Sequence, residues 1–254
     1  MAHSFGKVSY INSLPLFCAP SPFGIVEAIP SELNSMVENS RLDISLISRW
    51  IYPKVEKNYK VIPNFCIGGD GEIMSVKIFS RAPLESLADK SIFITGESGT
   101  SIRAFRYLVV EKFGFDIFKM KKAELAFADA VLLIGNKALS FDASKYAYSY
   151  DLGSMWREVL GIKMIYAVAV ARREIYDDVA ERVSEYFGRS LDEFGRNRAY
   201  HVARAAELFE KSEGVAIGAD IIDRYYSRFI FKFGGEDFSK SFNFVSNLSQ
   251  NGYL

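Results

Sequence analysis

Four short segments of the sequence place small polar residues beside predicted strands, where they could bind or position a substrate. They are residues 8–15, 70–76, 95–101 and 133–139. Asn12 follows a predicted strand, and its amide both donates and accepts hydrogen bonds. Ser75 follows an Asp-Gly turn and lies just inside the next strand. A helix-capping or turn-forming role for Asn12, and a plain strand role for Ser75, stay open on residue type alone.

The segment 95–101 reads Thr-Gly-Glu-Ser-Gly-Thr-Ser and precedes a predicted helix that begins at Ile102. The N-terminus of a helix exposes free N–H groups and carries a partial positive charge, which suits a carboxylate or a phosphate. The sequence therefore indicates an anion-binding segment, and an ordinary capped turn is the alternative. The residues concerned are Ser98, Gly99, Thr100 and Ser101. The segment lacks the Gly-Lys-Ser/Thr of a P-loop and the glycine spacing of a dinucleotide fold.

Histidine and cysteine are too sparse for most metal or nucleophilic sites. The chain has two histidines, His3 and His201, and two cysteines, Cys18 and Cys66. No Cys-x-x-Cys pair or histidine cluster indicates zinc. His201 lies in a charged helical stretch and is expected to be exposed, which argues against Ser-His-Asp or Cys-His catalysis. The cysteines are expected to be reduced and mostly buried.

Composition excludes several classes of protein. Lys+Arg and Asp+Glu both number 31, and this neutral balance argues against binding to nucleic acid or to an anionic membrane. The sequence has no run of about 18 apolar residues, so no membrane span is expected. The first residues lack the basic start and apolar stretch of a secretory signal peptide, so a cytoplasmic location is expected. Of the 254 residues, 49% are hydrophobic, which is enough for one large domain or two small lobes.

Strand-like and helix-like segments alternate along the first half of the chain. Strands are expected at 7–11, 43–48, 74–80, 91–95, 130–134 and 164–171, and helices at 31–39 (capped by Ser31), 102–113, 174–194, 196–211 and 217–226. The alternation predicts an α/β fold with mostly parallel sheets. We expect one lobe from residues 1–79 and 168–254 and a second from 80–167, with the chain crossing twice and a substrate cleft between them. Ser48 ends a predicted strand, and Gly135 and Asn136 follow another, so all three are expected to face that cleft and bind the substrate; a helix cap is the alternative for Asn136.

An ordered set of motifs resembles the chorismate dehydratase family. The set runs Val-Ser-Tyr-Ile-Asn-Ser-Leu-Pro at 8–15, Pro-Ser-Glu-Leu-Asn at 30–34, Leu-Asp-Ile-Ser-Leu-Ile-Ser at 42–48, Asp-Gly at 70–71, Ser-Val at 75–76, Thr-x-Glu-Ser-x-Thr-Ser at 95–101, Leu-Leu-Ile-Gly-x-x-Ala-Leu at 132–139 and Asp-Leu-Gly-x-x-Trp at 151–156. Any one of these motifs is weak evidence, but the whole set occurs in matching order between about residue 6 and residue 172.

The resemblance implies a type II periplasmic-binding-protein fold used as a cytosolic lyase. The reaction that it implies removes water from chorismate and gives 3-[(1-carboxyvinyl)oxy]benzoate, the first committed step of the futalosine route to menaquinone. It implies no metal or organic cofactor, and it assigns catalysis to Asn12 and Ser75. It also implies that the enolpyruvyl carboxylate of the substrate takes up the proton.

Two positions depart from the commoner family pattern, and both are expected to line the cleft. Asn136 replaces an aspartate, and Ala169 replaces a tryptophan. One alternative is the paralogous 1,4-dihydroxy-6-naphthoate synthase, which requires a mid-chain histidine, whereas this chain has none between residues 4 and 200. The other alternative is a non-catalytic solute-binding protein for a small carboxylate. The sequence gives no indication of an oligomeric state.

Overall fold

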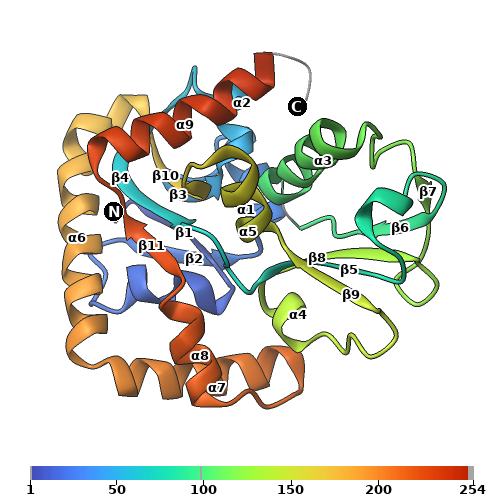
Figure 1. Cartoon of the computed structure of the whole chain (residues 1–254). Coiled ribbons are helices and arrows are strands. Elements are labelled where there is room, and N and C mark those ends of the chain that lie inside the picture. Colours follow the sequence, from blue (N-terminus) through green and yellow to red (C-terminus); the bar gives the residue numbers. More distant parts are fainter. Residues whose placement is uncertain (1, 98, 251–254) are drawn as a thin grey trace.

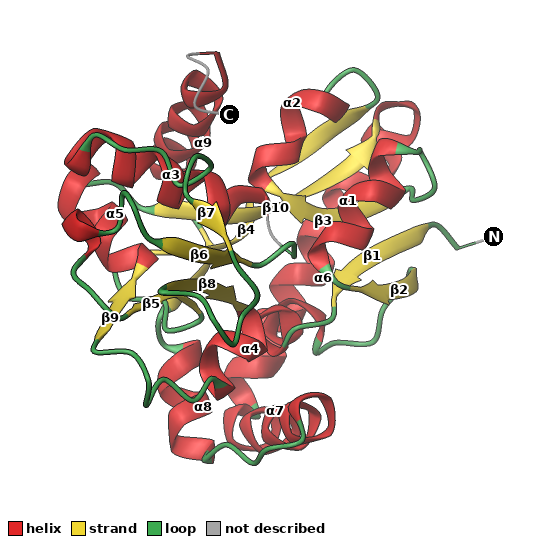
Figure 2. Cartoon of the chain, turned by 90° about the vertical axis from the view of Figure 1, so that its right-hand side faces the viewer, coloured by secondary structure: helices red, strands yellow, loops and turns green. Residues whose placement is uncertain are grey.

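A computed structural model describes residues 2–97 and 99–250 of the chain and contains two β-sheets flanked by helices. Figures 1 and 2 show the two sheets lying side by side. The first sheet has the strand order β11-β4-β10-β3-β1-β2, formed by Phe229–Lys232, Tyr59–Gly69, Met164–Arg172, Ile44–Ser48, Ser4–Val8 and Gly24–Ala28. The second has the order β7-β6-β8-β5-β9, formed by Lys121–Lys122, Ser91–Ile94, Ala130–Ile134, Val76–Ser80 and Tyr148–Asp151.

The two-sheet α/β architecture is as expected, but the sheets are mixed, so the prediction of mostly parallel sheets is wrong. Four strand pairings between described residues are parallel and five are antiparallel. A parallel pair needs a crossover connection, which is usually a helix. The chain instead leaves β4 directly for β5 in the other sheet, and it returns as β10, which runs antiparallel to both β3 and β4.

The chain passes between the sheets at two places. The first crossing joins Gly69 of β4 to Val76 of β5, and the second runs from Asp151 of β9 through helix α5 (Leu152–Leu160) to Met164 of β10. Both crossings lie a few residues before the expected boundaries at 79/80 and 167/168, because β5 belongs to the second sheet and the whole of β10 to the first.

Helices cover the sheets and carry the segments that will form the site. Beyond α5 they are α1 (Pro30–Glu38), α2 (Tyr52–Val55), α3 (Gly99–Phe113), α4 (Gly135–Ser140), α6 (Tyr176–Arg196), α7 (Arg198–Glu213), α8 (Ala219–Tyr226) and α9 (Gly235–Gln250). Helix α1 begins at Pro30 with Ile29 as its N-cap, so the expected cap at Ser31 is not formed. No helix among the described residues is both long enough and apolar enough to cross a membrane.

Helix α6 runs along one side of the first sheet (Figure 1) and supports the segment that follows β1. Its buried residues recur three or four positions apart, the spacing of one helical face: Val179, Val183, Tyr186, Phe187, Ser190 and Phe194. Phe187 is fully buried, with ring centroids 5.6 Å from Phe5 and 5.7 Å from Phe17. Phe17 ends a 3-10 helix, η1 (Ile11–Phe17). The aromatic cluster therefore fixes the segment that carries Asn12.

His201 is buried rather than exposed, so that prediction is wrong. Only 4% of the residue is accessible, and its ring lies 5.8 Å from the ring of Phe194. Its Nδ1 is 3.5 Å from the sulfur of Cys18. Helix α7 packs against both α6 and η1, so this face of α7 is covered despite its charged sequence.

Truncating the aromatic cluster should destabilise the fold. We expect Phe187→Ala to lower the free energy of unfolding by about 3–5 kcal/mol, because it removes a fully buried ring and leaves a cavity. Urea unfolding followed by circular dichroism measures the change. Phe127, which is 74% exposed, provides the matched control, and Phe127→Ala should stay within about 0.5 kcal/mol of the parent. Equal effects of the two substitutions would contradict this account of the core.

Candidate active site

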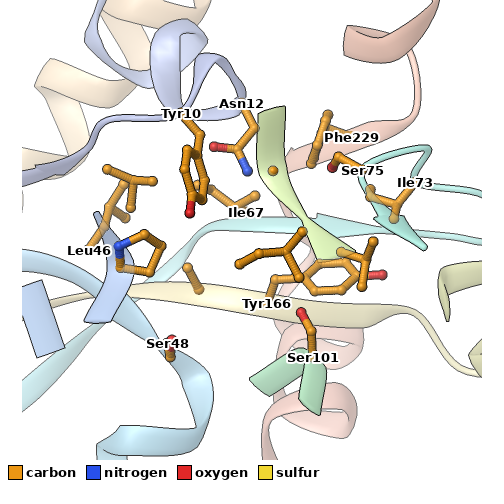
Figure 3. A pocket seen from close by; sticks show the side chains of 16 residues that line it. Tyr10, Asn12, Leu46, Ser48, Ile67, Ile73, Ser75, Ser101, Tyr166 and Phe229 are labelled. Carbon is orange, nitrogen blue, oxygen red and sulfur yellow. The ribbon is translucent and has the colours of Figure 1, made fainter. Parts of the chain in front are cut away.

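A cavity lies where the two sheets meet, and both sheets and the first crossing contribute to its wall (Figure 3). Its lining residues are Val8, Tyr10, Asn12, Pro30, Leu46, Ser48, Ile67, Ile73, Ser75, Val76, Ser101, Ile134, Gly135, Tyr166, Ala167 and Phe229. About 560 Å³ of space lies between the lining atoms, and part of this space is open to solvent.

Five of the nine predicted site residues line this cavity. Asn12 comes from η1, Ser48 from the last position of β3, and Ser75 from the first crossing. Ser101 lies in the first turn of α3, and Gly135 begins α4 directly after β8. In Figure 3, Asn12 and Ser75 lie on one side of the cavity, and Ser48 and Ser101 lie on the opposite side.

Gly99 and Thr100 do not line the cavity, and Ser98 lies outside the described residues. The Thr100 hydroxyl donates to the carbonyl oxygen of Tyr166 at 2.9 Å and accepts from the backbone N–H of Trp50 at 3.3 Å. A Cβ added at Gly99 would lie 3.0 Å from the indole ring of Trp50. The start of α3 is therefore docked on the first sheet, and this contact holds Ser101 at the cavity wall.

Asn136 also lies outside the cavity and supports η1 from behind. Its Oδ1 accepts from the Ile11 N–H at 3.4 Å, and its Nδ2 donates to the Ser212 hydroxyl at 3.1 Å. Tyr226 adds a second support, because its hydroxyl donates to the Ile11 carbonyl oxygen at 2.9 Å. Asn136 thus ties α4 to η1 and α7, and it borders a neighbouring outer pocket and not the cavity itself.

The side chain of Asn12 has unused hydrogen-bonding capacity. Its Oδ1 is buried, and it has no hydrogen-bond partner among the described residues. A buried acceptor without a partner is unfavourable, and a ligand with a suitable donor would satisfy it. Figure 3 shows the amide directed into the cavity. Asn12 is therefore a candidate for binding a ligand in this cavity.

Ser75 is held by its backbone at the edge of the second sheet. Its N–H donates to the Ile73 carbonyl oxygen, and its own carbonyl oxygen accepts from the Gly135 N–H, both at 2.8 Å. Burial raises the pKa of the neighbouring Tyr225, and the Ser75 hydroxyl partly offsets that rise. The two hydroxyls do not meet in good hydrogen-bonding geometry, because Tyr225 Oη has no partner among the described residues.

Two side chains that support the cavity wall were not identified from the sequence. Asn34 binds Ser48 twice, donating to its hydroxyl at 3.2 Å and accepting from its N–H at 3.0 Å. Tyr10 packs on Gly135, where an added Cβ would lie 2.7 Å from the Tyr10 ring and φ is +61°. Tyr10 lies in the motif at 8–15 and Asn34 in the motif at 30–34. Their position inside these motifs was the sequence feature that could have marked them as part of the site.

Tyr10 separates the cavity from the outer pocket, since it lines both. Its hydroxyl donates to the Glu97 carboxylate, which also pairs with Lys137. Burial is the main cause that raises the pKa of Tyr10, and the hydrogen bond to Glu97 raises it further. Tyr10 follows a strand of the first sheet and Glu97 follows a strand of the second, so this bond joins the two sheets at the mouth of the cavity.

The cavity is polar at a few points but carries no charge of its own. None of its described lining residues is Asp, Glu, Lys, Arg or His. Its lining residues with polar side chains are Tyr10, Asn12, Ser48, Ser75, Ser101 and Tyr166. Such a wall can orient a polar ligand and stabilise developing charge with fixed dipoles. It offers no described side chain whose ordinary pKa suits a general base near neutral pH.

Comparison with solved structures shows the fold. A protein of Archaeoglobus fulgidus superposes with a TM-score of 0.77 at 14% identity, covering 99% of this chain and 98% of that one. The alkanesulfonate-binding protein SsuA of Xanthomonas axonopodis pv. citri, bound to MOPS, gives a TM-score of 0.65 at 12% identity, covering 99% and 93%. A Candida albicans protein described as having the generic periplasmic binding protein fold gives 0.60 at 10% identity, covering 98% and 91%. The chain therefore has the two-lobed periplasmic-binding-protein-like fold.

Comparison with known sequences shows the family. The chorismate dehydratase of Thermus thermophilus is 26% identical in an alignment 190 residues long, which covers 66% of this chain and 69% of that protein. A family model described as menaquinone biosynthesis matches residues 3–245. Because that match spans nearly the whole sequence and agrees with the resemblance seen in the motifs, this chain belongs to the menaquinone biosynthesis family.

Proposed function

We propose that this protein is a cytoplasmic chorismate dehydratase, which converts chorismate to 3-[(1-carboxyvinyl)oxy]benzoate on the futalosine route to menaquinone. The observation that carries the proposal is the meeting of Asn12 and Ser75, the two positions implicated by the family motifs, at one uncharged cavity. The Thermus thermophilus relative supports the choice of reaction.

The reaction suits a cavity without a base of its own. Chorismate loses the proton on its ether-bearing ring carbon together with the neighbouring hydroxyl, and the ring becomes aromatic. The enolpyruvyl carboxylate of the substrate takes up the proton, so the protein has to hold that carboxylate close to the carbon. Such proximity can contribute about 7–11 kcal/mol in well-oriented systems.

The polar groups of the wall divide naturally between the two ends of the substrate. Asn12 and Ser75 orient the ring and the departing hydroxyl from one side of the cavity. Ser101, in the first turn of α3, binds a substrate carboxylate from the other side, where the partial positive charge of the helix N-terminus favours an anion. Gly99 and Thr100 contribute indirectly, through their contacts with Trp50 and Tyr166.

Two other functions remain as outcomes of the same assay. The naphthoate synthase paralogue needs a histidine base, but no described lining residue is a histidine, and His201 lies beside Cys18. A solute-binding protein would bind chorismate without forming an aromatic product. Following chorismate and aromatic product by absorbance separates dehydration from binding alone.

Removing the Ser75 hydroxyl should slow turnover without unfolding the protein. We expect Ser75→Ala to lower kcat by about 10²–10³-fold, the usual effect of deleting one preorganised hydrogen-bonding group. Ser80 provides a matched control, because it is buried at the far end of β5, the strand that follows Ser75, and its hydroxyl donates to the Ala82 carbonyl oxygen away from the cavity. Near-normal turnover by Ser75→Ala would exclude the catalytic role.

Substitution of Asn12 should have a comparable effect on chorismate loss. We expect Asn12→Ala to lower kcat/KM by about 10²-fold or more, because the amide that faces the ring is lost. The control is Asn39→Ala, which removes an exposed amide at the end of α1. If Asn12→Ala and Asn39→Ala turn over chorismate equally well, Asn12 has no part in the reaction.

Substrate-assisted proton transfer predicts a flat pH profile for kcat from about pH 6 to about pH 9. Substrate carboxylates titrate below this range, and burial raises the pKa of Tyr10, Tyr166 and Tyr225, so those hydroxyls stay protonated throughout it. Steady-state assays across the range measure the profile. An inflection near 6.5 would instead indicate a histidine base.

A further inference from the structure

The first crossing between the sheets has an unusual backbone next to Ser75. Gly71 has a φ of +105° and Met74 a φ of +63°. Residues with a Cβ rarely adopt this left-handed region, so Met74 needs support from its surroundings. Ser75 follows directly, and its position at the cavity depends on the conformation of Met74.

The support comes from the carboxylate of Asp151. Its Oδ2 accepts from the Met74 N–H at 2.8 Å, and its Oδ1 accepts from the Ile73 N–H at 3.0 Å. Oδ1 also accepts from the Ser154 N–H at 3.1 Å, which caps helix α5. Burial raises the pKa of Asp151, and these backbone hydrogen bonds lower it. One half-buried carboxylate therefore joins the first crossing to the second.

The two crossings also touch through their backbones. A Cβ added at Gly153 would overlap the carbonyl oxygen of Gly71, so only a glycine allows this approach. The same Cβ would lie 3.1 Å from the Tyr166 hydroxyl, which has no hydrogen-bond partner among the described residues. The ring of Tyr166 lines the cavity, so the crossing lies directly behind the wall that carries Ser75.

We propose that Asp151 is a positioning residue for the proposed dehydration, which holds the backbone of residues 73–74 so that Ser75 faces the substrate. The inference rests on the proposed function. Asp151 is not among the described residues that line the cavity, so it acts through Ser75 and not on the substrate.

The test is the Asp151→Asn variant assayed with chorismate. An amide has one acceptor oxygen, and its NH₂ group would face a backbone N–H donor, so part of the support is lost. We expect kcat to fall about 10²-fold with little change in KM, since a small misplacement of a reacting group has this effect. Asp129→Asn is the matched control, because Asp129 accepts from the N–H and hydroxyl of Ser91 away from the cavity and should retain turnover.

The combination with Ser75→Ala distinguishes positioning from general stability. If Asp151 acts through Ser75, the double variant is no slower than Ser75→Ala alone. If the two substitutions instead lower kcat by independent factors that multiply in the double variant, the proposal is wrong. Amide hydrogen exchange adds a readout other than activity, and the amides of Ile73 and Met74 should exchange faster in Asp151→Asn; unchanged exchange also overturns the proposal.

A further variant keeps the test decisive if Asp151→Asn does not fold. Asp151→Ser retains a good N-cap for α5 but is too short to reach both 73 and 74. Wild-type kcat in Asp151→Ser would show that Asp151 only caps the helix. Absence of turnover by the unsubstituted protein would instead refute the dehydratase function, whereas normal turnover by both Asp151 variants would refute only the positioning role.

Discussion

The constraint on which the site depends is the double crossing between the sheets. Ser48 ends β3 and Asn12 follows β1, both strands of the first sheet, whereas Ser101 and Gly135 lie in helices that follow strands of the second sheet. The distance between these two sets of residues depends on the two crossings. The crossings touch at Gly71 and Gly153, and Asp151 at the second crossing binds the backbone of the first. The Tyr10–Glu97 bond at the mouth and the Thr100–Tyr166 bond at the start of α3 make the same connection elsewhere. Chemistry that needs donors on both sides of a ligand therefore depends on these few contacts.

An uncharged wall suits the proposed substrate, chorismate, which has two carboxylates and would supply its own base. A lysine or arginine in contact with the enolpyruvyl carboxylate would lower its basicity, because an opposite charge stabilises the anion. Hydroxyl and amide dipoles hold the carboxylates with less effect on the pKa, and they need no reorganisation as charge moves through the ring. At the mouth, Glu97 and Lys137 pair with each other, and neither is among the described residues that line the cavity.

Local patterns predicted the elements well where the strand was short and apolar, and poorly where long-range packing decided the outcome. The strand Ala130–Ile134 and the helix ending at Phe113 lie where the apolar runs indicated. Strand β4 was missed because Pro63 lacks an N–H and Asn64 has a φ of +69°, and the pairing with β10 shifts register around them. The burial of His201 and the role of Asp151 depend on segments far apart in the sequence, which periodicity does not report. Asn12 and Ser75 were found only because motifs, and not composition, marked them.

The two departures from the commoner family pattern can now be assigned to packing behind the site. Neither Asn136 nor Ala169 is among the described residues that line the cavity. Asn136 donates to Ser212, which an aspartate carboxylate could not do, so the amide fits this particular contact between α4 and α7. Ala169 is fully buried and pairs with Leu46 in the sheet, where a larger side chain would require different neighbours. Both changes therefore alter how the wall is supported, and they leave its polar groups where the proposed reaction needs them.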